Sequence, residues 1–263
     1  MSDFRSGFVA IVGRPNAGKS TLINALVGSK IAITSHHPNT TRHAIRGIVN
    51  GPDFQAILVD TPGVHKPKTL LGHRLNAVVG ESMDSVDAII MCLPADEDSG
   101  AGDVFIAAEI AKHPRAKKIA VVTKTDLVSK KSLANRLLGI QSLAKGFTWD
   151  EIIPVSAAIH DQIGLLEELI AKTLPEGPEF YPRDMKSDQE NSQLICELIR
   201  EAALRDALQE LPHSIMVTID EMSERDEKGS RPFYDIHATI HVERDSQRGI
   251  LLGHQGERLK DIG

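Results

Sequence analysis

A glycine-rich stretch near the start of the chain has the residue types and spacing of a phosphate-binding loop. Residues 13–20 fit the pattern G-x-x-x-x-G-K-[ST], follow the apolar run 8–12, and open a helical stretch, 20–27. The glycines let backbone N–H groups wrap around phosphate oxygens, and the helix N-terminus adds its positive end. We therefore predict a nucleoside triphosphate site in which Lys19 reaches the β- and γ-phosphates and Ser20 ligates Mg²⁺. Its members are Gly13, Arg14, Pro15, Asn16, Ala17, Gly18, Lys19 and Ser20.

A second motif follows a predicted strand at 54–59, about 40 residues after the loop. Residues 60–63 read Asp-Thr-Pro-Gly, and the whole motif, Asp60, Thr61, Pro62 and Gly63, is assigned to the nucleotide site. An aspartate at a strand end can hold the Mg²⁺ shell, and the Gly63 N–H can meet a γ-phosphate. Because that contact exists only before hydrolysis, the loop that follows is a candidate switch. We expect loop and then helix over residues 64–82.

The third motif is the stretch Thr123-Lys124-Thr125-Asp126 after an apolar run at 118–123. The Asp126 carboxylate can accept hydrogen bonds from both N1–H and the exocyclic amine of guanine. Adenine has no donor at N1 and would leave the carboxylate unpaired. After a further strand at 152–155, the backbone of Ser156 and Ala157 is placed to contact the base. These residues predict selection of guanine, with contacts from Thr123, Lys124, Asp126, Ser156 and Ala157.

Strands and helices alternate through this part of the chain, which predicts a doubly wound, mostly parallel α/β sheet. In such folds the ligand lies across the carboxyl ends of the strands. Beyond those already given, we expect strands at 43–49 and 86–93 and helices at 102–113 and 162–174.

Composition places the chain among ordinary soluble globular proteins. It has 263 residues, of which 41% are hydrophobic and 25% are charged, and its net charge of −6 argues against a strongly basic nucleic-acid coat. The two lone cysteines, Cys92 and Cys196, indicate a reducing cytosol. No apolar run approaches 18 residues.

A second region begins after a proline-rich stretch. Residues 1–174 form the predicted nucleotide-binding domain, 175–187 a semi-rigid Pro-rich linker, and 188–263 a second, smaller α+β domain. The second domain shows a helical pattern at 188–209 and strand patterns at 214–221 and 233–243. They are followed by Gly253, His254, Gln255 and Gly256.

Taken together, the motifs resemble those of the Ras-like GTPase superfamily, and most closely the bacterial ribosome-assembly GTPases of the translation-factor-related group. The similarity rests on Gly-Arg-Pro-Asn-Ala-Gly-Lys-Ser-Thr at 13–21, Ile-Thr-Ser at 33–35, Thr-Thr-Arg-His at 40–43 and Asp-Thr-Pro-Gly-Val at 60–64. The second domain, with its Gly-x-x-Gly at 253–256, resembles a KH domain of the prokaryotic topology. In that fold the loop clamps unpaired nucleotides.

The resemblance implies hydrolysis of GTP to GDP and phosphate, with Lys19, Thr41 and Gly63 as catalytic residues and Ser20, Thr41 and Asp60 around Mg²⁺. Thr40 is the second choice for the role of Thr41. A K⁺ ion near Asn16 is a further expectation, and it would supply the positive charge that an arginine finger supplies elsewhere.

The implied partners are 16S ribosomal RNA and the 30S subunit, which the protein helps to mature, with Gly253, His254, Gln255 and Gly256 contacting RNA. We expect a cytoplasmic monomer that binds no DNA, with peripheral association at the inner face of the cell membrane left open.

Three features of the sequence bear on these expectations: the first and the last depart from the pattern of the relatives, and the second is a replacement that the relatives share. Thr123 stands where Asn usually begins the guanine motif, and we expect Asp126 to preserve specificity with weaker bracing of the loop. Val64 stands where Ras-type enzymes place the glutamine that orients water, so we expect slow intrinsic hydrolysis. The chain ends at Gly263, a turn or two into the helix after Gly256, so we expect the second domain to be incomplete.

Two alternative functions remain open from the residues. One is a GTP-gated module that binds a protein or a membrane surface and hydrolyses GTP only incidentally, although no lipidation motif or basic amphipathic helix supports a membrane partner. The other is an ATPase, because of Thr123. Competition by GDP but not by ADP would exclude the ATPase.

Overall fold

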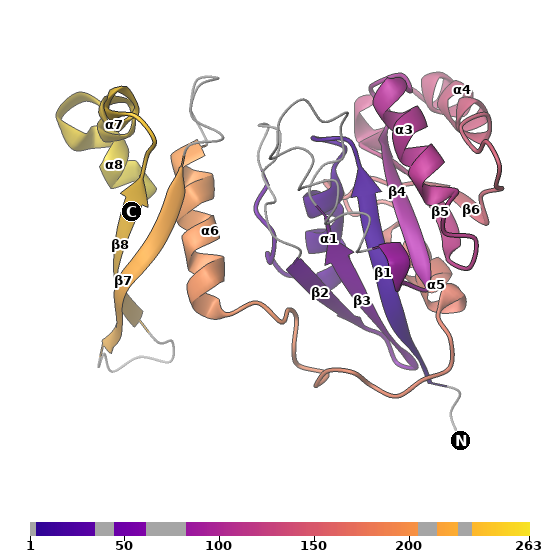
Figure 1. Cartoon of the computed structure of the whole chain (residues 1–263), viewed down its shortest axis with the longest axis horizontal. Helices are drawn as coiled ribbons and strands as arrows, with labels where there is room; N and C mark the ends of the chain where they lie inside the picture. The colour runs from indigo at the N-terminus through magenta and orange to yellow at the C-terminus, as the bar shows by residue number, and fades with distance from the viewer. Residues whose placement is uncertain (1–3, 35–44, 62–82, 205–214, 226–232) are drawn as a thin grey trace. The chain divides into compact units, whose positions relative to one another are not determined.

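The computed structural model describes residues 4–34, 45–61, 83–204, 215–225 and 233–263 (Figure 1). These residues form two compact units. The first ends at Asp188, and the second begins at Gln189.

The first unit is built on a six-stranded sheet with the strand order β2-β3-β1-β4-β5-β6. All neighbouring strands are parallel except β2 and β3, which pair antiparallel because only the short turn at 51–53 joins them. The predicted doubly wound, mostly parallel sheet is confirmed. The strands are β1 (Arg5–Gly13), β2 (Ile45–Asn50), β3 (Phe54–Asp60), β4 (Ala88–Pro94), β5 (Lys117–Thr123) and β6 (Glu151–Pro154).

Helices cover both faces of this sheet (Figure 1). On one face, Leu22 of α1 and Leu166 of α5 pack in a core with alternate residues of β1 such as Ile11. On the other face, Ile106 of α3 and Ile140 of α4 pack in a second core. Burial on both faces explains why the strands are continuously apolar in sequence, and each such side chain contributes roughly 1.5–3 kcal/mol. The helices are α1 (Lys19–Val27), α3 (Ala101–Ile110), α4 (Lys130–Gln141) and α5 (Ile163–Thr173), with a short 3₁₀ turn, η1 (Thr125–Leu127).

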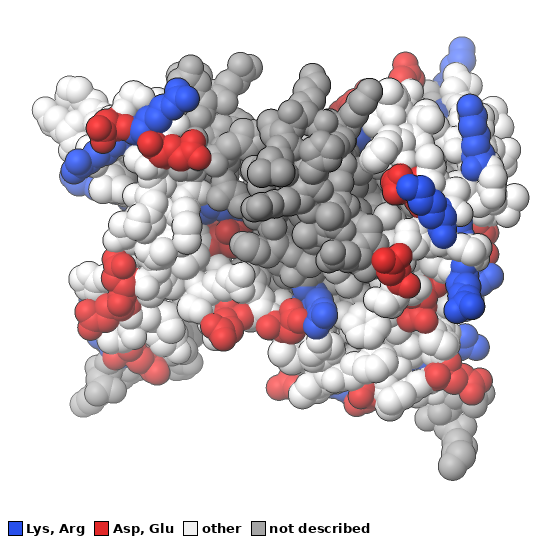
Figure 2. Space-filling model, viewed as in Figure 1, with Lys and Arg blue, Asp and Glu red and all other residues white. Residues whose placement is uncertain are grey.

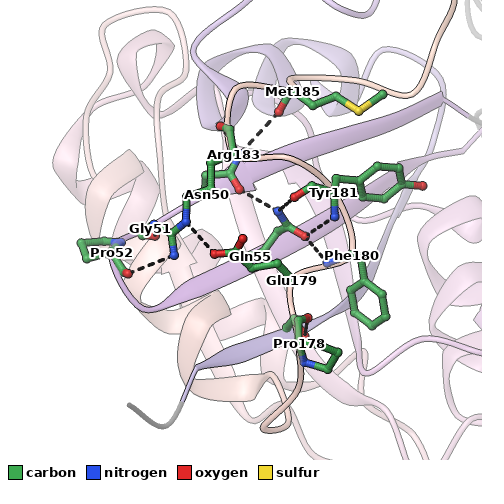
Figure 3. Close-up of polar contacts among 11 residues, drawn as sticks. Asn50, Gly51, Pro52, Gln55, Pro178, Glu179, Phe180, Tyr181, Arg183 and Met185 are labelled. Carbon is green, nitrogen blue, oxygen red and sulfur yellow. Dashed lines mark hydrogen bonds and ion pairs between the residues drawn. The ribbon is translucent and has the colours of Figure 1, made fainter. Parts of the chain in front are cut away.

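The proline-rich segment at 175–187 lies along the β2–β3 edge of the first unit (Figure 3). Gln55 of β3 is fully buried there and holds the segment with both ends of its amide. Its Nε2 donates to the carbonyl of Tyr181 at 2.8 Å, and its Oε1 accepts from the backbone N–H groups of Phe180 and Tyr181 at 2.7 and 3.0 Å. The ring of Phe180 also packs against that of Phe8, with ring centroids 5.3 Å apart.

Contacts to the first unit continue as far as Asp188. The N–H of Ile48 in β2 donates to the carbonyl of Lys186 at 2.9 Å, and Asp188 pairs with Arg46 at 3.3 Å. The segment that we predicted as a linker between two domains is therefore part of the first unit. The physical reason is that the buried amide of Gln55 needs backbone partners, which this segment supplies.

The second unit contains α6 (Asn191–Leu204), β7 (Met216–Arg225), β8 (Phe233–His241), α7 (Asp245–Leu252), a 3₁₀ turn η2 (His254–Gly256) and α8 (Glu257–Ile262). Strands β7 and β8 pair antiparallel, with an irregularity between Ile219 and Glu221. Among the described residues of this unit, the buried apolar side chains that pack together are Ala203, Leu204, Ile215, Val217 and Leu251.

Candidate nucleotide-binding site

Five parallel strands end at one edge of the sheet, and the loops that follow them carry the predicted site residues. These loops follow β1, β3, β4, β5 and β6. Because β1 pairs in parallel with both β3 and β4, the loops after Gly13 and Asp60 are brought together although 47 positions separate those two residues (60 − 13). This edge is where an open α/β sheet binds its ligand.

Lys19 lies beneath the phosphate-binding loop at the first turn of α1. Its side chain is buried, and its ammonium group donates to the carbonyls of Gly13 at 3.2 Å and Arg14 at 3.0 Å. Burial lowers the pKa of Lys19, and the nearby Asp60 carboxylate opposes that shift. The ammonium is thus enclosed by the loop, in the position from which the P-loop lysine binds phosphate.

The loop backbone has two left-handed positions, Asn16 with φ of 62° and Gly18 with φ of 85°. At Gly18 a side chain would be strained by the backbone conformation, and its Cβ would come within 3.4 Å of Thr123. The left-handed backbone is therefore what favours glycine at position 18, since 3.4 Å is an ordinary contact distance. Within the loop, Ala17 is fully buried and its N–H donates to the carbonyl of Arg14 at 3.2 Å, while Pro15 is partly exposed.

Ser20 and Asp60 present oxygen atoms to the same point. The Ser20 hydroxyl donates to Oδ2 of Asp60 at 3.2 Å, and Asp60 is fully buried. A hydroxyl and a carboxylate suit Mg²⁺, which is usually held by one or two protein ligands together with phosphate oxygens and water. No group of three or more His, Cys, Asp or Glu residues in the described ranges could hold a metal on its own.

Three predicted site residues, Thr41, Pro62 and Gly63, lie outside the described residues. Thr61 is described and fully buried. Its hydroxyl donates to the carbonyl of Ile11 at 2.6 Å, so its side chain ties the end of β3 to β1.

The predicted base-recognition loop is connected to the phosphate-binding loop through Thr123. Its hydroxyl donates to the carbonyl of Ala17 at 2.8 Å. We expected weaker bracing from threonine at this position, but the hydroxyl makes a direct bond between the two loops. Lys124, next along the chain, is left-handed with φ of 58°, which turns the chain into η1.

Asp126 is held by the loop after β6. The Ser156 hydroxyl donates to Oδ1 of Asp126 at 2.5 Å, which orients an otherwise exposed carboxylate. Ala157 packs against the core beside it. The predicted base-recognition residues are thus brought together from two loops that are 30 positions apart in sequence.

Arg14 belongs to the loop by sequence, but its side chain extends away from it. Its guanidinium contacts Asp103 of α3 and Glu97 in the loop after β4. Sequence reasoning did not select either acidic residue. The one local signal was the position of Asp103 in the first turn of a predicted helix.

The Gly-x-x-Gly stretch of the second unit forms the turn between α7 and α8. Gly253 and Gly256 are left-handed, with φ of 67° and 78°, and His254 and Gln255 between them are exposed. Arg258, just after the turn, donates from Nη2 to the backbone carbonyl of Ala203 at 3.2 Å. On the face drawn in Figure 2, acidic and basic side chains of the described residues intermingle, without one broad basic surface.

A phosphate-binding loop after β1, an aspartate at the end of β3 and a braced Thr-Lys-Thr-Asp turn after β5 define the first unit as a P-loop GTPase domain. Family models agree, since residues 8–124 match "50S ribosome-binding GTPase" and residues 210–263 match "KH domain". GTPase Era of Streptomyces coelicolor is 54% identical over 262 residues, which cover 98% of this chain and 83% of that protein. GTPase Era of Mycolicibacterium smegmatis is 52% identical over 264 residues, covering 100% of this chain and 87% of that protein. The chain belongs to the Era family of GTPases.

Solved structures of Era share this fold along nearly the whole chain. Era in complex with MgGDPNP and nucleotides 1506–1542 of 16S ribosomal RNA matches with a TM-score of 0.90 at 35% identity, over 99% of this chain and 86% of that one. An Aquifex aeolicus Era variant bound to GDP and AlF₄⁻ matches with a TM-score of 0.89 at 34% identity, over 99% and 86%. The predicted family, fold class and GTPase activity are confirmed.

Proposed function

We propose that this GTPase is a nucleotide-controlled switch that binds 16S ribosomal RNA through its second unit and assists maturation of the 30S subunit in the cytoplasm. The observation that carries this proposal is the joint presence, in one chain, of a braced guanine-nucleotide site and an exposed Gly-x-x-Gly turn. The similarity to Era bound to MgGDPNP and 16S ribosomal RNA over 99% of this chain supports it.

We assign the nucleotide contacts by chemistry. Lys19 and the loop amides bind the β- and γ-phosphates, and Ser20 and Asp60 hold Mg²⁺, which neutralises charge between these phosphates. Asp126, oriented by Ser156, accepts the two donors on the guanine edge. Thr41, Pro62 and Gly63 contact the γ-phosphate side in this proposal, which makes their loops the parts that respond to hydrolysis.

We propose slow intrinsic hydrolysis, because a valine at position 64 cannot orient water by hydrogen bonding. A K⁺ ion beside Asn16 would supply positive charge at the triphosphate. The exposed, left-handed Asn16 has an amide oxygen suited to that role. A hydrolysis rate that is the same in K⁺ and Na⁺ would contradict this part of the proposal.

RNA is proposed to bind at the turn formed by Gly253, His254, Gln255 and Gly256. In KH modules such a turn clamps the backbone of about four unpaired nucleotides. Two glycines without Cβ atoms let a phosphodiester approach closely, and the two residues between them are exposed here. Binding of this kind is local, which is compatible with a net charge of −6.

The direct test places two carboxylates in the turn with the double variant His254→Asp/Gln255→Asp. We expect loss of binding to a labelled RNA that copies nucleotides 1506–1542 of 16S ribosomal RNA, because anions there repel the RNA backbone. Affinity for GDP should stay unchanged.

The matched control is Asn191→Asp/Gln193→Asp at the exposed start of α6, which adds the same charge to the same unit. RNA binding that falls equally in both variants would point to a nonspecific charge effect and contradict the proposed site.

The monomeric state and a peripheral contact with the inner face of the cell membrane are separate proposals. Sedimentation and liposome flotation would test them. No helix within the described ranges is long and apolar enough to cross a membrane.

A further inference from the structure

Arg14 connects the phosphate-binding loop, through its backbone carbonyl, with helix α3, through its side chain. Its backbone carbonyl accepts from the ammonium of Lys19 at 3.0 Å and from the N–H of Ala17 at 3.2 Å. Its side chain leaves the loop, so that Nε donates to Oδ1 of Asp103 at 2.9 Å and Nη2 lies 3.1 Å from Glu97. The backbone of Arg14 is therefore part of the loop, while its side chain is bound by two carboxylates outside the loop.

Of these two carboxylates, Asp103 is the fixed one. Its side chain is fully buried in the first turn of α3, and its second oxygen accepts from the N–H of Gly100 at 2.8 Å. A buried carboxylate is costly unless it is paired and hydrogen-bonded, and the ion pair that meets this requirement is the one with Arg14. Glu97, by contrast, is about half exposed, and such pairs contribute little.

The packing around Arg14 is shaped for this arrangement. Gly102 precedes Asp103 on α3, and a Cβ at Gly102 would lie 2.9 Å from Cδ and 3.2 Å from Cγ of Arg14. These atoms are the middle of the side chain, which cannot move aside while the guanidinium stays bound to Asp103. The absence of a side chain at Gly102 therefore makes room for the pair.

The loop between β4 and α3 is also bound to Thr123 and Lys124 at the end of β5. The N–H of Ala95 donates to the carbonyl of Thr123 at 2.8 Å, and Asp96 lies 3.6 Å from the ammonium of Lys124. Arg136 of α4 donates from Nε to the carbonyl of Pro94 at 3.2 Å. Asp103 is thus anchored on an element that is itself fixed, so it can hold Arg14 in one place.

We propose that Asp103 is a positioning residue for nucleotide binding, which acts through Arg14 to hold the phosphate-binding loop in its binding conformation. Asp103 itself touches no phosphate. Its contribution is preorganisation, because a loop whose amides are already converged loses less entropy when the phosphates bind. The guanidinium of Arg14 has a structural task in this arrangement and is not the source of charge at the γ-phosphate.

The test compares GDP with GMP, which lacks the β-phosphate, by competition against a fluorescent GDP analogue. In Asp103→Asn we expect the Kd for GDP to rise about tenfold and the Kd for GMP to rise much less, so that the GMP-to-GDP ratio of Kd values falls. The reason is that an amide offers one oxygen where the carboxylate offers two, and its NH₂ faces another donor. If Asp103 had a merely structural role, the substitution would weaken binding of GDP and of GMP equally, and the ratio of their Kd values would stay unchanged.

Asp150→Asn is the matched control for this substitution. Asp150 also accepts a backbone N–H, from Lys118 at 2.8 Å, and pairs with Lys117 at 3.0 Å, but it precedes β6 and lies away from the loops after the strands. We expect the ratio to keep its wild-type value in this variant. A ratio that falls equally in Asp150→Asn and Asp103→Asn would overturn the proposal.

Gly102→Ala tests the same role with Asp103 intact, in case the asparagine variant does not fold. The added Cβ displaces the Arg14 side chain, so the ratio should again fall. Gly139→Ala on α4 is its control, because a Cβ there meets nothing within 4 Å.

In the background of Arg14→Ala, Asp103→Asn should have no additional effect on the ratio. Additive effects of these two substitutions, or an unchanged ratio in Gly102→Ala, would refute action through Arg14.

Discussion

At the scale of single residues, hydroxyl groups hold the two halves of the nucleotide site together. Thr123 connects the base-recognition loop to the phosphate-binding loop, and Ser156 orients Asp126. Motif patterns predict Thr123 and Asp126 because the chemistry of guanine and phosphate restricts the residue types. They assign Ser156 only a backbone contact, and the structure adds its side chain.

Thr123→Val should weaken both folding and nucleotide binding. The variant keeps most of the side-chain volume but leaves the buried carbonyl of Ala17 without its donor, a loss of about 1 kcal/mol. We expect a lower urea midpoint and a severalfold higher Kd for GDP by calorimetry. Thr123→Ser keeps the hydroxyl and should retain most of the affinity. Equal losses in the two variants would mean that packing, and not the hydrogen bond, is what matters.

Ser156→Ala should reduce discrimination between guanine and hypoxanthine. Without the Ser156 hydroxyl, Asp126 samples more orientations and binds the exocyclic amine of guanine less well. The Kd for GDP should therefore rise several times more than the Kd for IDP, whose base has no such amine. A parallel rise for both nucleotides in competition assays would argue that Ser156 only supports the loop.

At this scale the limit of sequence reasoning is the pairing of distant residues. Arg14 and Asp103 are 89 positions apart, and Gln55 meets Tyr181 at a separation of 126. Each of these residues has an ordinary local role in sequence, as a loop position, a helix start or a strand position. Their partners follow from strand order and from the path of the chain, which local periodicity does not contain.

At the scale of elements, apolar runs locate the strands well because the sheet is buried on both faces. The predicted strand 118–123 is observed at Lys117–Thr123, and the run 54–59 at Phe54–Asp60. Helix α4 shows the opposite case, since we assigned no element to residues 127–150. Leu133, Leu137 and Ile140 pack against the second core at helical spacing, so the sequence does carry an apolar stripe here, which the exposed Leu138 beside it makes harder to see.

Gln55→Leu should release the segment 175–187 from the β2–β3 edge. Leucine fits the buried volume but cannot bond the backbone of Phe180 and Tyr181, which then lack partners (Figure 3). We expect trypsin to cut after Arg183 or Lys186 several times faster than in the wild type. Gln141→Leu, at an exposed position of α4, is the control and should leave the cleavage rate unchanged. Unchanged cleavage in Gln55→Leu would show that other contacts suffice to hold the segment.

The start of β5 carries a pH-dependent contribution to stability. Burial raises the pKa of Asp150, but the Lys118 N–H and the Lys117 ammonium outweigh it and hold that pKa below the ordinary value of 3.8. A carboxylate with a lowered folded-state pKa stabilises above the unfolded-state value, and the stabilisation is lost as pH falls through the folded-state value. Asp150→Asn should therefore be less stable than the wild type at pH 7, and the difference should shrink below about pH 4. A difference independent of pH would contradict this assignment.

At the scale of the whole molecule, the boundary between the two units falls after the Pro-rich segment. Asp188 pairs with Arg46 of the first unit, and the second unit begins at Gln189, two residues before α6. The Pro-rich composition predicts a spacer of 13 residues (175 to 187), whereas in the structure this segment belongs to the first unit, which ends at Asp188. The proposed switch requires that the nucleotide state of the first unit alters RNA binding by the second unit.

The most direct measurement of this coupling is the affinity for RNA in the two nucleotide states. The RNA copies nucleotides 1506–1542 of 16S ribosomal RNA, and the protein is saturated either with Mg²⁺ and a non-hydrolysable GTP analogue or with Mg²⁺ and GDP. We predict binding at least about threefold tighter with the GTP analogue, lost in His254→Asp/Gln255→Asp. Equal RNA affinity in both states, with normal binding of both nucleotides, would contradict a nucleotide-controlled switch.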